Sequence, residues 1–184
     1  NGIPMIGNEK AVFLDRDGTI IEDVGYLSSP QGVRLLTGTV EGLRRMREMS
    51  FKLVVITNQS GIARGYFSVS DYESVHSKLL DILGEEGIEL DSAYFCPHHP
   101  EGKVAPFGIV CDCRKPKPGM LQQAAADLNL DLGASCMIGN SDADIGAGKA
   151  AGCSTILIGY ESAVLEPDYK ANDLIQAAAL IARR

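Results

Sequence analysis

The chain has 184 residues, 45% of them hydrophobic and 22% charged, a composition that suits one domain with a sizeable core. Its formal net charge of −7 argues against nucleic-acid or anionic-membrane partners, and no apolar stretch is long enough to span a bilayer. Residues 1–7 lack the basic and apolar regions of a signal peptide. We expect a single domain over residues 1–184, monomeric and cytoplasmic.

Segments with the pattern of strands and of helices alternate along the chain. Apolar runs typical of buried strands occupy residues 11–16, 52–57, 91–96, 135–139 and 153–158. Helical patterns occupy residues 39–49, 118–128, 140–151 and 172–183, and a further helix is predicted to start at a Ser70–Glu73 capping box and end near residues 84–87. This alternation predicts an α/β fold, with a parallel sheet covered by helices on both faces.

The first strand ends in two acids, Asp15 and Asp17, followed by Gly18 and Thr19. Alternation along a strand end places both carboxylates on one side, where they repel each other unless a cation lies between them. Mg²⁺ suits oxygen ligands, Asp15 can attack phosphorus, and Asp17 can protonate a leaving oxygen. The alternative is an acidic turn without chemistry.

Polar residues follow other strands at the same predicted edge of the sheet. Thr57 and Asn58 offer a hydroxyl and an amide for a phosphoryl oxygen, or else a capped turn. Lys115 can balance phosphoryl charge and Arg114 can grip a second anionic group, unless both belong to a solvated basic loop. Two prolines in this segment stiffen it and favour the functional interpretation.

Together these segments resemble the haloacid dehalogenase (HAD) superfamily of phosphotransferases. The resemblance rests on four motifs, which are Asp15-x-Asp17-Gly-Thr, Thr57-Asn58, Lys115-Pro-Lys-Pro and Gly139-Asn140-x-x-x-Asp144. It implies a Rossmann-like HAD fold with strand order 5-4-1-2-3 and Mg²⁺-dependent phosphoryl transfer through Asp15. The short spans between the motifs leave little room for a large cap domain.

A cysteine-rich loop lies between the third strand and the Lys115 motif. Cys96, His98, Cys111 and Cys113 have the chemistry and spacing of a closed structural Zn²⁺ site. His99 is an alternative to His98, and an unmetallated loop with reduced thiols is a third interpretation. A metal here would fix the zinc loop, defined as about residues 96–113, and with it the adjacent Arg114 and Lys115.

With residues 58–67 and 96–102, this loop makes the chain similar to the D-glycero-D-manno-heptose 1,7-bisphosphate 7-phosphatase family. The resemblance implies a phosphosugar substrate, Mg²⁺ and structural Zn²⁺ as cofactors, and catalysis by Asp15, Asp17, Thr57 and Lys115. The substrate-binding residues that it implies are Arg16, Asp23, Val24, Gly25, Tyr26, Thr57, Asn58, Gln59, Ser60, Arg114, Lys115 and Ser141.

The last motif departs from this pattern. Asn140 stands where the superfamily has an acid that binds metal, and Ser141 stands where these phosphatases commonly have a lysine. The predicted Mg²⁺ ligands are Asp15, Asp17 and Asn140, with Asp144 as a further candidate and Asp142 acting through water. Asn140 is either natural or introduced.

Two other functions stay open: a histidinol-phosphatase, whose loop is usually shorter, and a zinc-stabilised binding protein. A polynucleotide 3′-phosphatase is disfavoured by the acidic charge.

Overall fold

The computed structural model describes residues 9–159 and 164–183 and contains a six-stranded sheet in which every pairing is parallel. The strand order is β3-β2-β1-β4-β5-β6. The strands are β1 (Ala11–Leu14), β2 (Lys52–Asn58), β3 (Ser92–Cys96), β4 (Cys136–Gly139), β5 (Ser154–Ile158) and β6 (Tyr169–Ala171). The predicted α/β class with a parallel sheet is confirmed.

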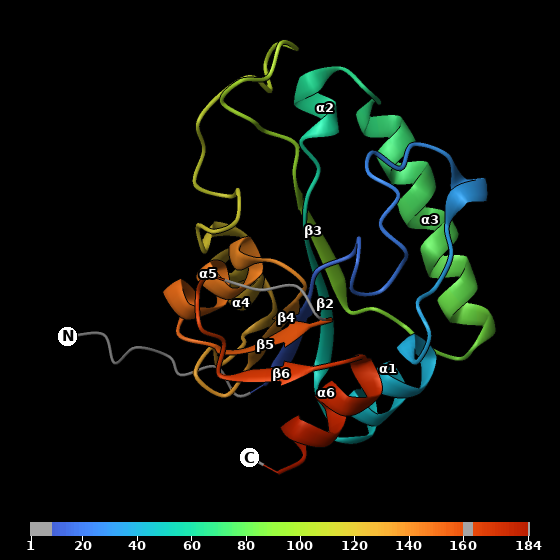
Figure 1. Cartoon of the computed structure of the whole chain (residues 1–184), viewed down its shortest axis with the longest axis vertical. Coiled ribbons are helices and arrows are strands. Elements are labelled where there is room, and N and C mark those ends of the chain that lie inside the picture. The colour runs from blue at the N-terminus through green and yellow to red at the C-terminus, as the bar shows by residue number, and fades with distance from the viewer. Residues whose placement is uncertain (1–8, 160–163, 184) are drawn as a thin grey trace.

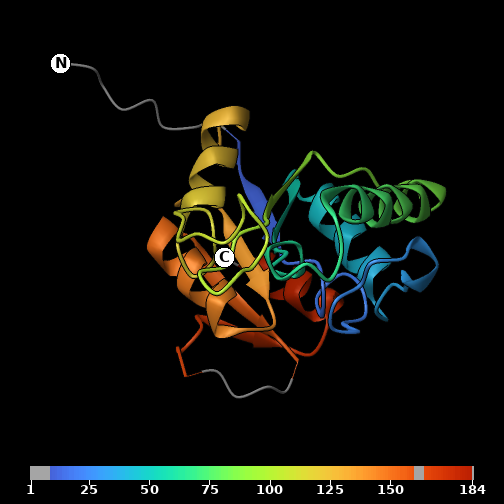
Figure 2. The ribbon, with the colours of Figure 1, turned by 90° about the horizontal axis from the view of Figure 1, so that it is seen from above.

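Helices cover both faces of this sheet (Figures 1 and 2). They are α1 (Thr39–Glu48), α2 (Gly61–Arg64), α3 (Val69–Glu85), α4 (Gly119–Leu128), α5 (Asp142–Ala151) and α6 (Leu174–Ile181), with a 3-10 turn at Pro30–Gly32. Helices α1, α3 and α6 pack on one face and α4 and α5 on the other, as seen from above in Figure 2. Each face of the sheet packs against its helices in a separate hydrophobic core. Alternate residues of β1 point into the two cores: Val12 and Leu14 lie in the core with α1, α3 and α6, and Ala11 and Phe13 lie in the core with α4 and α5.

The predicted strand order 5-4-1-2-3 was right for five strands but incomplete. β6 adds to the free edge of β5 through the register Ile156↔Tyr169 to Ile158↔Ala171. Its three residues are too few, and two of them too exposed, to show a strand pattern in the sequence.

Two other details differ from the prediction. The four-residue helix α2 was not predicted, because four residues are too few to show a repeating helical pattern in the sequence. The capping box of α3 is formed by Ser68 and Asp71 rather than by Ser70 and Glu73. Ser68 Oγ accepts from the Asp71 backbone N–H at 3.1 Å, and Asp71 Oδ2 accepts from the Ser68 backbone N–H at 2.7 Å.

Chain segments that follow the carboxyl ends of the strands gather at one end of the sheet. β2 leads into α2 there, and the long loop between β3 and α4 lies at the same end (Figure 1). In open parallel sheets this is where ligands bind. Within the described part of the chain, no helix is both long and apolar enough to cross a membrane. The predicted absence of a signal peptide concerns residues 1–7, which lie outside the described residues.

Candidate active site

A cavity of ≈ 480 Å³ opens at the carboxyl ends of β1, β2 and β4. It brings together residues from five separated segments of the sequence. Its lining consists of Asp15, Asp17, Asp23, Gly25, Tyr26, Thr57, Asn58, Gln59, Ser60, Gly61, Phe67, Lys115, Asn140, Ser141, Ala143 and Asp144. Thirteen of these sixteen were predicted as catalytic, substrate-binding or metal-binding residues.

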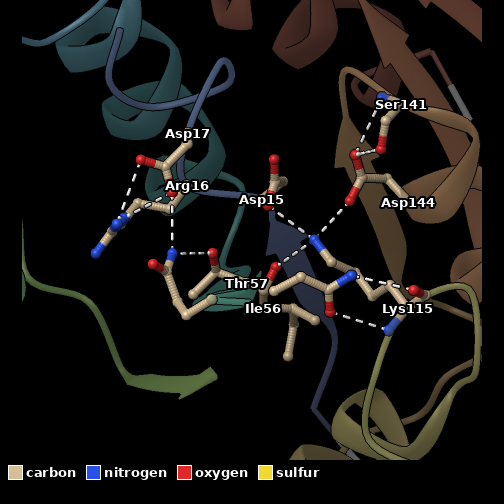
Figure 3. A network of polar contacts seen from close by, with 10 residues as sticks. Asp15, Arg16, Asp17, Ile56, Thr57, Lys115, Ser141 and Asp144 are labelled. Atoms are coloured by element: carbon tan, nitrogen blue, oxygen red, sulfur yellow. Dashed lines mark hydrogen bonds and ion pairs between the residues drawn. The ribbon is translucent and has the colours of Figure 1, made fainter. Parts of the chain in front are cut away.

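The buried ammonium group of Lys115 joins three elements of the fold (Figure 3). Its Nζ donates to Asp15 Oδ1 after β1 at 2.7 Å, to Asp144 Oδ1 in α5 at 2.6 Å, and to the Ile56 carbonyl in β2 at 2.7 Å. The Lys115 side chain is only 2% exposed, so water contributes little to its solvation. Three acceptors for three N–H groups satisfy the buried ammonium.

Burial and neighbouring charges alter the pKa of Asp15 and of Lys115. Burial raises the pKa of Asp15 to about 7, and the nearby Asp144 adds to the rise while Lys115 counteracts it. Burial alone would lower the pKa of Lys115, but the charges of Asp144 and Asp15 outweigh it and raise that pKa. Lys115 therefore carries its charge at neutral pH, whereas Asp15 needs further positive charge to be fully ionised there.

Asp17 lies in a tight turn rather than on a continuing strand. β1 ends at Leu14, and the Arg16 carbonyl accepts from the backbone N–H groups of residues 19, 20 and 21. Gly18 has φ +82°, and a Cβ there would lie 2.2 Å from Asn140 Nδ2, so both the turn and the close packing need glycine. Asp15 and Asp17 line the same cavity, but Figure 3 shows that their carboxylates meet different partners.

The end of β2 supplies three polar side chains with different tasks. Thr57 Oγ1 accepts from Gln59 Nε2 at 2.8 Å, which leaves the Thr57 hydroxyl proton available to a ligand. Asn58 forms two hydrogen bonds of 3.0 Å with the Lys115 backbone, one to its N–H and one to its carbonyl. The Asn58 amide, predicted to hold a phosphoryl oxygen, lines the cavity and also fixes the Lys115 segment.

The turn between β4 and α5 places Asp144. Its Oδ2 accepts from the Ser141 backbone N–H at 3.1 Å and from the Ser141 hydroxyl at 2.7 Å, in a capping box at the start of α5. Gly139 is required beside it, because a Cβ there would lie 2.2 Å from Asp144 Cγ. Asp142, predicted to support the metal through water, accepts from the backbone N–H groups of Val164 and Leu165.

Three predicted substrate-binding residues do not line the cavity: Arg16, Val24 and Arg114. Arg16 is buried beside Asp17, Val24 is 60% exposed, and Arg114 directs Nη1 to the His98 carbonyl at 3.4 Å. The structure adds three lining residues that were not predicted, namely Gly61, Phe67 and Ala143. Gly61 and Phe67 belong to the segment 58–67 that supported the family resemblance, so this segment held the signal for them.

The donor set of the cavity suits a divalent cation. Of the described residues that line it, four are aspartates and one is a lysine. Burial and the charge of Asp144 raise the pKa of Asp15 more than Lys115 lowers it, so a bound cation would favour the ionised carboxylate. Carboxylate, amide and backbone carbonyl oxygens suit Mg²⁺, and Asp15, Asp17 and Asn140 could supply them.

A second metal-binding arrangement lies in the zinc loop. The ligand atoms of Cys96, His98, Cys111 and Cys113 all lie within 4.8 Å of one another. Their sulfur–sulfur distances are 3.1 to 3.5 Å, close to the separation of about 3.8 Å in a tetrahedral zinc site. His99 lies apart from this group: its Nε2 is 3.1 Å from Arg64 Nη2, and its Nδ1 accepts from the Glu101 backbone N–H. The geometry favours His98 over His99.

Comparisons with known proteins agree with this site. Residues 112–177 match the HAD-hydrolase-like family. The chain is 46% identical to D-glycero-β-D-manno-heptose-1,7-bisphosphate 7-phosphatase of Yersinia pestis, over 82% of this chain and 80% of the relative. It is 42% identical to the protein of that name from Pasteurella multocida, over 93% and 94%.

A solved structure extends the similarity to the fold. The D,D-heptose 1,7-bisphosphate phosphatase from B. bronchiseptica, complexed with magnesium and phosphate, superposes with a TM-score of 0.83 at 30% identity. The match covers 95% of this chain and 98% of that one. The chain therefore belongs to the D-glycero-β-D-manno-heptose-1,7-bisphosphate 7-phosphatase family of HAD-like hydrolases.

Proposed function

We propose that this protein is a Mg²⁺-dependent phosphatase that removes the C7 phosphate of D-glycero-β-D-manno-heptose 1,7-bisphosphate. The observation that carries the proposal is the buried contact of Lys115 with Asp15 and Asp144, at the bottom of a cavity where β1 ends. The names of the relatives supply the substrate, including its β configuration. The cavity of ≈ 480 Å³ is large enough for a phosphosugar.

In this proposal Asp15 is the nucleophile. A carboxylate oxygen of Asp15 bonds to phosphorus while the C7 oxygen leaves, and Asp17 protonates that oxygen. Asp17 then takes a proton from water, whose oxygen attacks phosphorus and releases Asp15. The Thr57 hydroxyl and the Lys115 ammonium stabilise the transferring phosphoryl group. Bound Mg²⁺ would offset the repulsion between the Asp15 carboxylate and the anionic phosphate.

We further propose that Cys96, His98, Cys111 and Cys113 bind Zn²⁺ as a structural ion. Four ligands close the coordination sphere, so no position is open for substrate. The role of the ion would be geometric. Arg114 and Lys115 directly follow Cys113, so a fixed loop would keep Lys115 in the cavity lining.

The proposed substrate is tested by measuring phosphate release from α- and β-heptose 1,7-bisphosphate and from histidinol phosphate, each with saturating Mg²⁺. We expect kcat/KM for the β-heptose to exceed that for histidinol phosphate at least about tenfold, since the substrate must satisfy polar groups of the site. Phosphorus NMR of the product should show that the C1 phosphate remains. Preferential turnover of histidinol phosphate would replace the proposed function by the alternative.

A second prediction concerns the contribution of Asn140 to Mg²⁺ binding. Because Asn140 is neutral, Asn140→Asp should tighten Mg²⁺ binding about tenfold or more, which calorimetric titration measures directly. Gln122→Glu, an equal charge change at an exposed position of α4, should leave the affinity unchanged. Unchanged affinity in Asn140→Asp would remove Asn140 from the proposed metal site. A wild type that binds the sugar without hydrolysing it, and gains turnover as Asn140→Asp, would establish the binding-protein alternative.

A further inference from the structure

The side chain of Arg16 is buried although it carries a charge. It is 1% exposed, and its guanidinium lies against the ring of Tyr72 in α3, with Cζ 5.3 Å from the ring centroid. Removing a guanidinium from water is unfavourable unless an anion and hydrogen bonds compensate for the lost hydration. A side chain placed in this way needs a compensating partner inside the protein.

That partner is the adjacent residue, Asp17. Arg16 Nε donates to Asp17 Oδ2 at 3.0 Å and Nη2 donates to Asp17 Oδ1 at 3.2 Å, so two N–H groups meet both carboxylate oxygens. Among the described residues, Arg16 forms no other ion pair, and its third nitrogen, Nη1, has no hydrogen-bond partner. Asp17 is therefore the anion that compensates for the buried charge of Arg16.

Gln59 completes the environment of the same carboxylate. Its Nε2 donates to Asp17 Oδ2 at 3.0 Å and also to Thr57 Oγ1 at 2.8 Å (Figure 3). Each carboxylate oxygen offers two lone pairs. Arg16 and Gln59 occupy both of those on Oδ2, whereas Oδ1 receives one hydrogen bond and keeps a lone pair.

We propose that Arg16 is a positioning residue, anchored on Tyr72, that orients Asp17 and leaves Oδ1 as the atom that carries the catalytic proton. This inference rests on the proposed function. The Oδ1 proton moves to the ester oxygen as its bond to phosphorus breaks and an Asp15 oxygen bonds to phosphorus. Asp17 then takes a proton from water as the water oxygen bonds to phosphorus and the Asp15–phosphorus bond breaks, which releases inorganic phosphate.

The test compares leaving groups that do and do not need a proton. A sugar alkoxide leaves slowly unless it is protonated, whereas 4-nitrophenolate leaves without a proton. In Arg16→Met we expect kcat/KM, which reports on the steps up to departure of the leaving group, to fall about 100-fold for heptose 1,7-bisphosphate and less than about threefold for 4-nitrophenyl phosphate. Asp17→Asn should show the same division between substrates, and Arg16→Lys should recover part of the loss.

If Arg16 had a purely structural role, Arg16→Met would lower the rates for both substrates together. If Arg16 had no role, both rates would stay unchanged. Either result overturns the proposal. Arg44→Met, which removes an arginine that is 45% exposed in its side chain, should change neither rate. If Arg16→Met does not fold, Arg16→Lys, which loses the two-point contact with Asp17, must show the same selective loss to a smaller extent. If the wild type hydrolyses a different sugar phosphate, only the proposed substrate is overturned. The role of Arg16 can then be tested by comparing that sugar phosphate with 4-nitrophenyl phosphate. No hydrolysis of any phosphomonoester would overturn both.

Discussion

Asp15→Asn is expected to lower turnover of the heptose bisphosphate by about 10⁴-fold or more, because an amide cannot attack phosphorus in place of the carboxylate. The same variant should alter the pH dependence of stability. The pKa of Asp15 rises from 3.8 to about 7 on folding, so the folded wild type holds a proton between these pH values that the unfolded chain has lost. Wild-type stability should therefore fall as pH rises from 4 to 7, and the Asp15→Asn substitution removes this part of the decline.

Both effects can be measured on one pair of proteins. Steady-state phosphate release gives the turnover, and urea unfolding in zinc-loaded, Mg²⁺-free buffer gives the free energy of unfolding at each pH. Asp81→Asn, the same chemical change at an exposed position of α3, should match the wild type in both measurements. Turnover by Asp15→Asn above about 1% of wild type would exclude Asp15 as the nucleophile.

Removal of metal from the zinc loop is expected to have the next largest effect. Without the ion, the four ligands lose the bonds that join them, and the Lys115 segment keeps only the hydrogen bonds of Asn58 and of its own side chain. A displacement of about 1 Å at a catalytic group can cost about 100-fold in rate, so we expect at least this loss in kcat after zinc is chelated and Mg²⁺ is restored. Thermal unfolding should also shift to lower temperature, and added Zn²⁺ should reverse both changes.

The two neighbouring histidines provide a matched comparison for this experiment. His98→Ala removes a ligand and should lower the zinc content measured by atomic absorption, whereas His99→Ala should keep about one zinc per chain. Equal zinc content in the two variants would contradict the proposed ligand set. Full activity of the zinc-free protein with Mg²⁺ would contradict the geometric role of the ion.

The parts of the fold that could be predicted are those with a long or fully buried pattern. The apolar runs of β1, β2 and β4 and the spacing in α1 and α4 are evident because each element buries whole faces. β6 and α2 gave no such pattern: β6 owes its pairing to the free edge of β5, and α2 is a single turn between β2 and the segment leading to α3. Tertiary context alone determines elements of this kind.

The sequence predicted which residues form the site but not which of their side chains contact one another. Motif order indicated that Asp15, Thr57, Lys115 and Asp144 meet at one end of the sheet, and they line one cavity. The chemistry of individual side chains depended on the turn after β1. Alternation would separate Arg16 from Asp17, but the turn folds their side chains together. The family resemblance implied substrate binding for Arg16, whose side chain is buried.

The three acceptors of the Lys115 ammonium also bear on how the chain folds. They lie 100, 59 and 29 residues away in sequence, so the ammonium can leave water only after β1, β2 and the start of α5 have come together. Such distant contacts form slowly, because long loops must close before any bond compensates for the lost chain entropy. We therefore expect assembly of the charged centre to be a late event in folding. A chain emerging from the ribosome keeps these charges hydrated, and phosphatase activity would report the completed fold rather than any part of it.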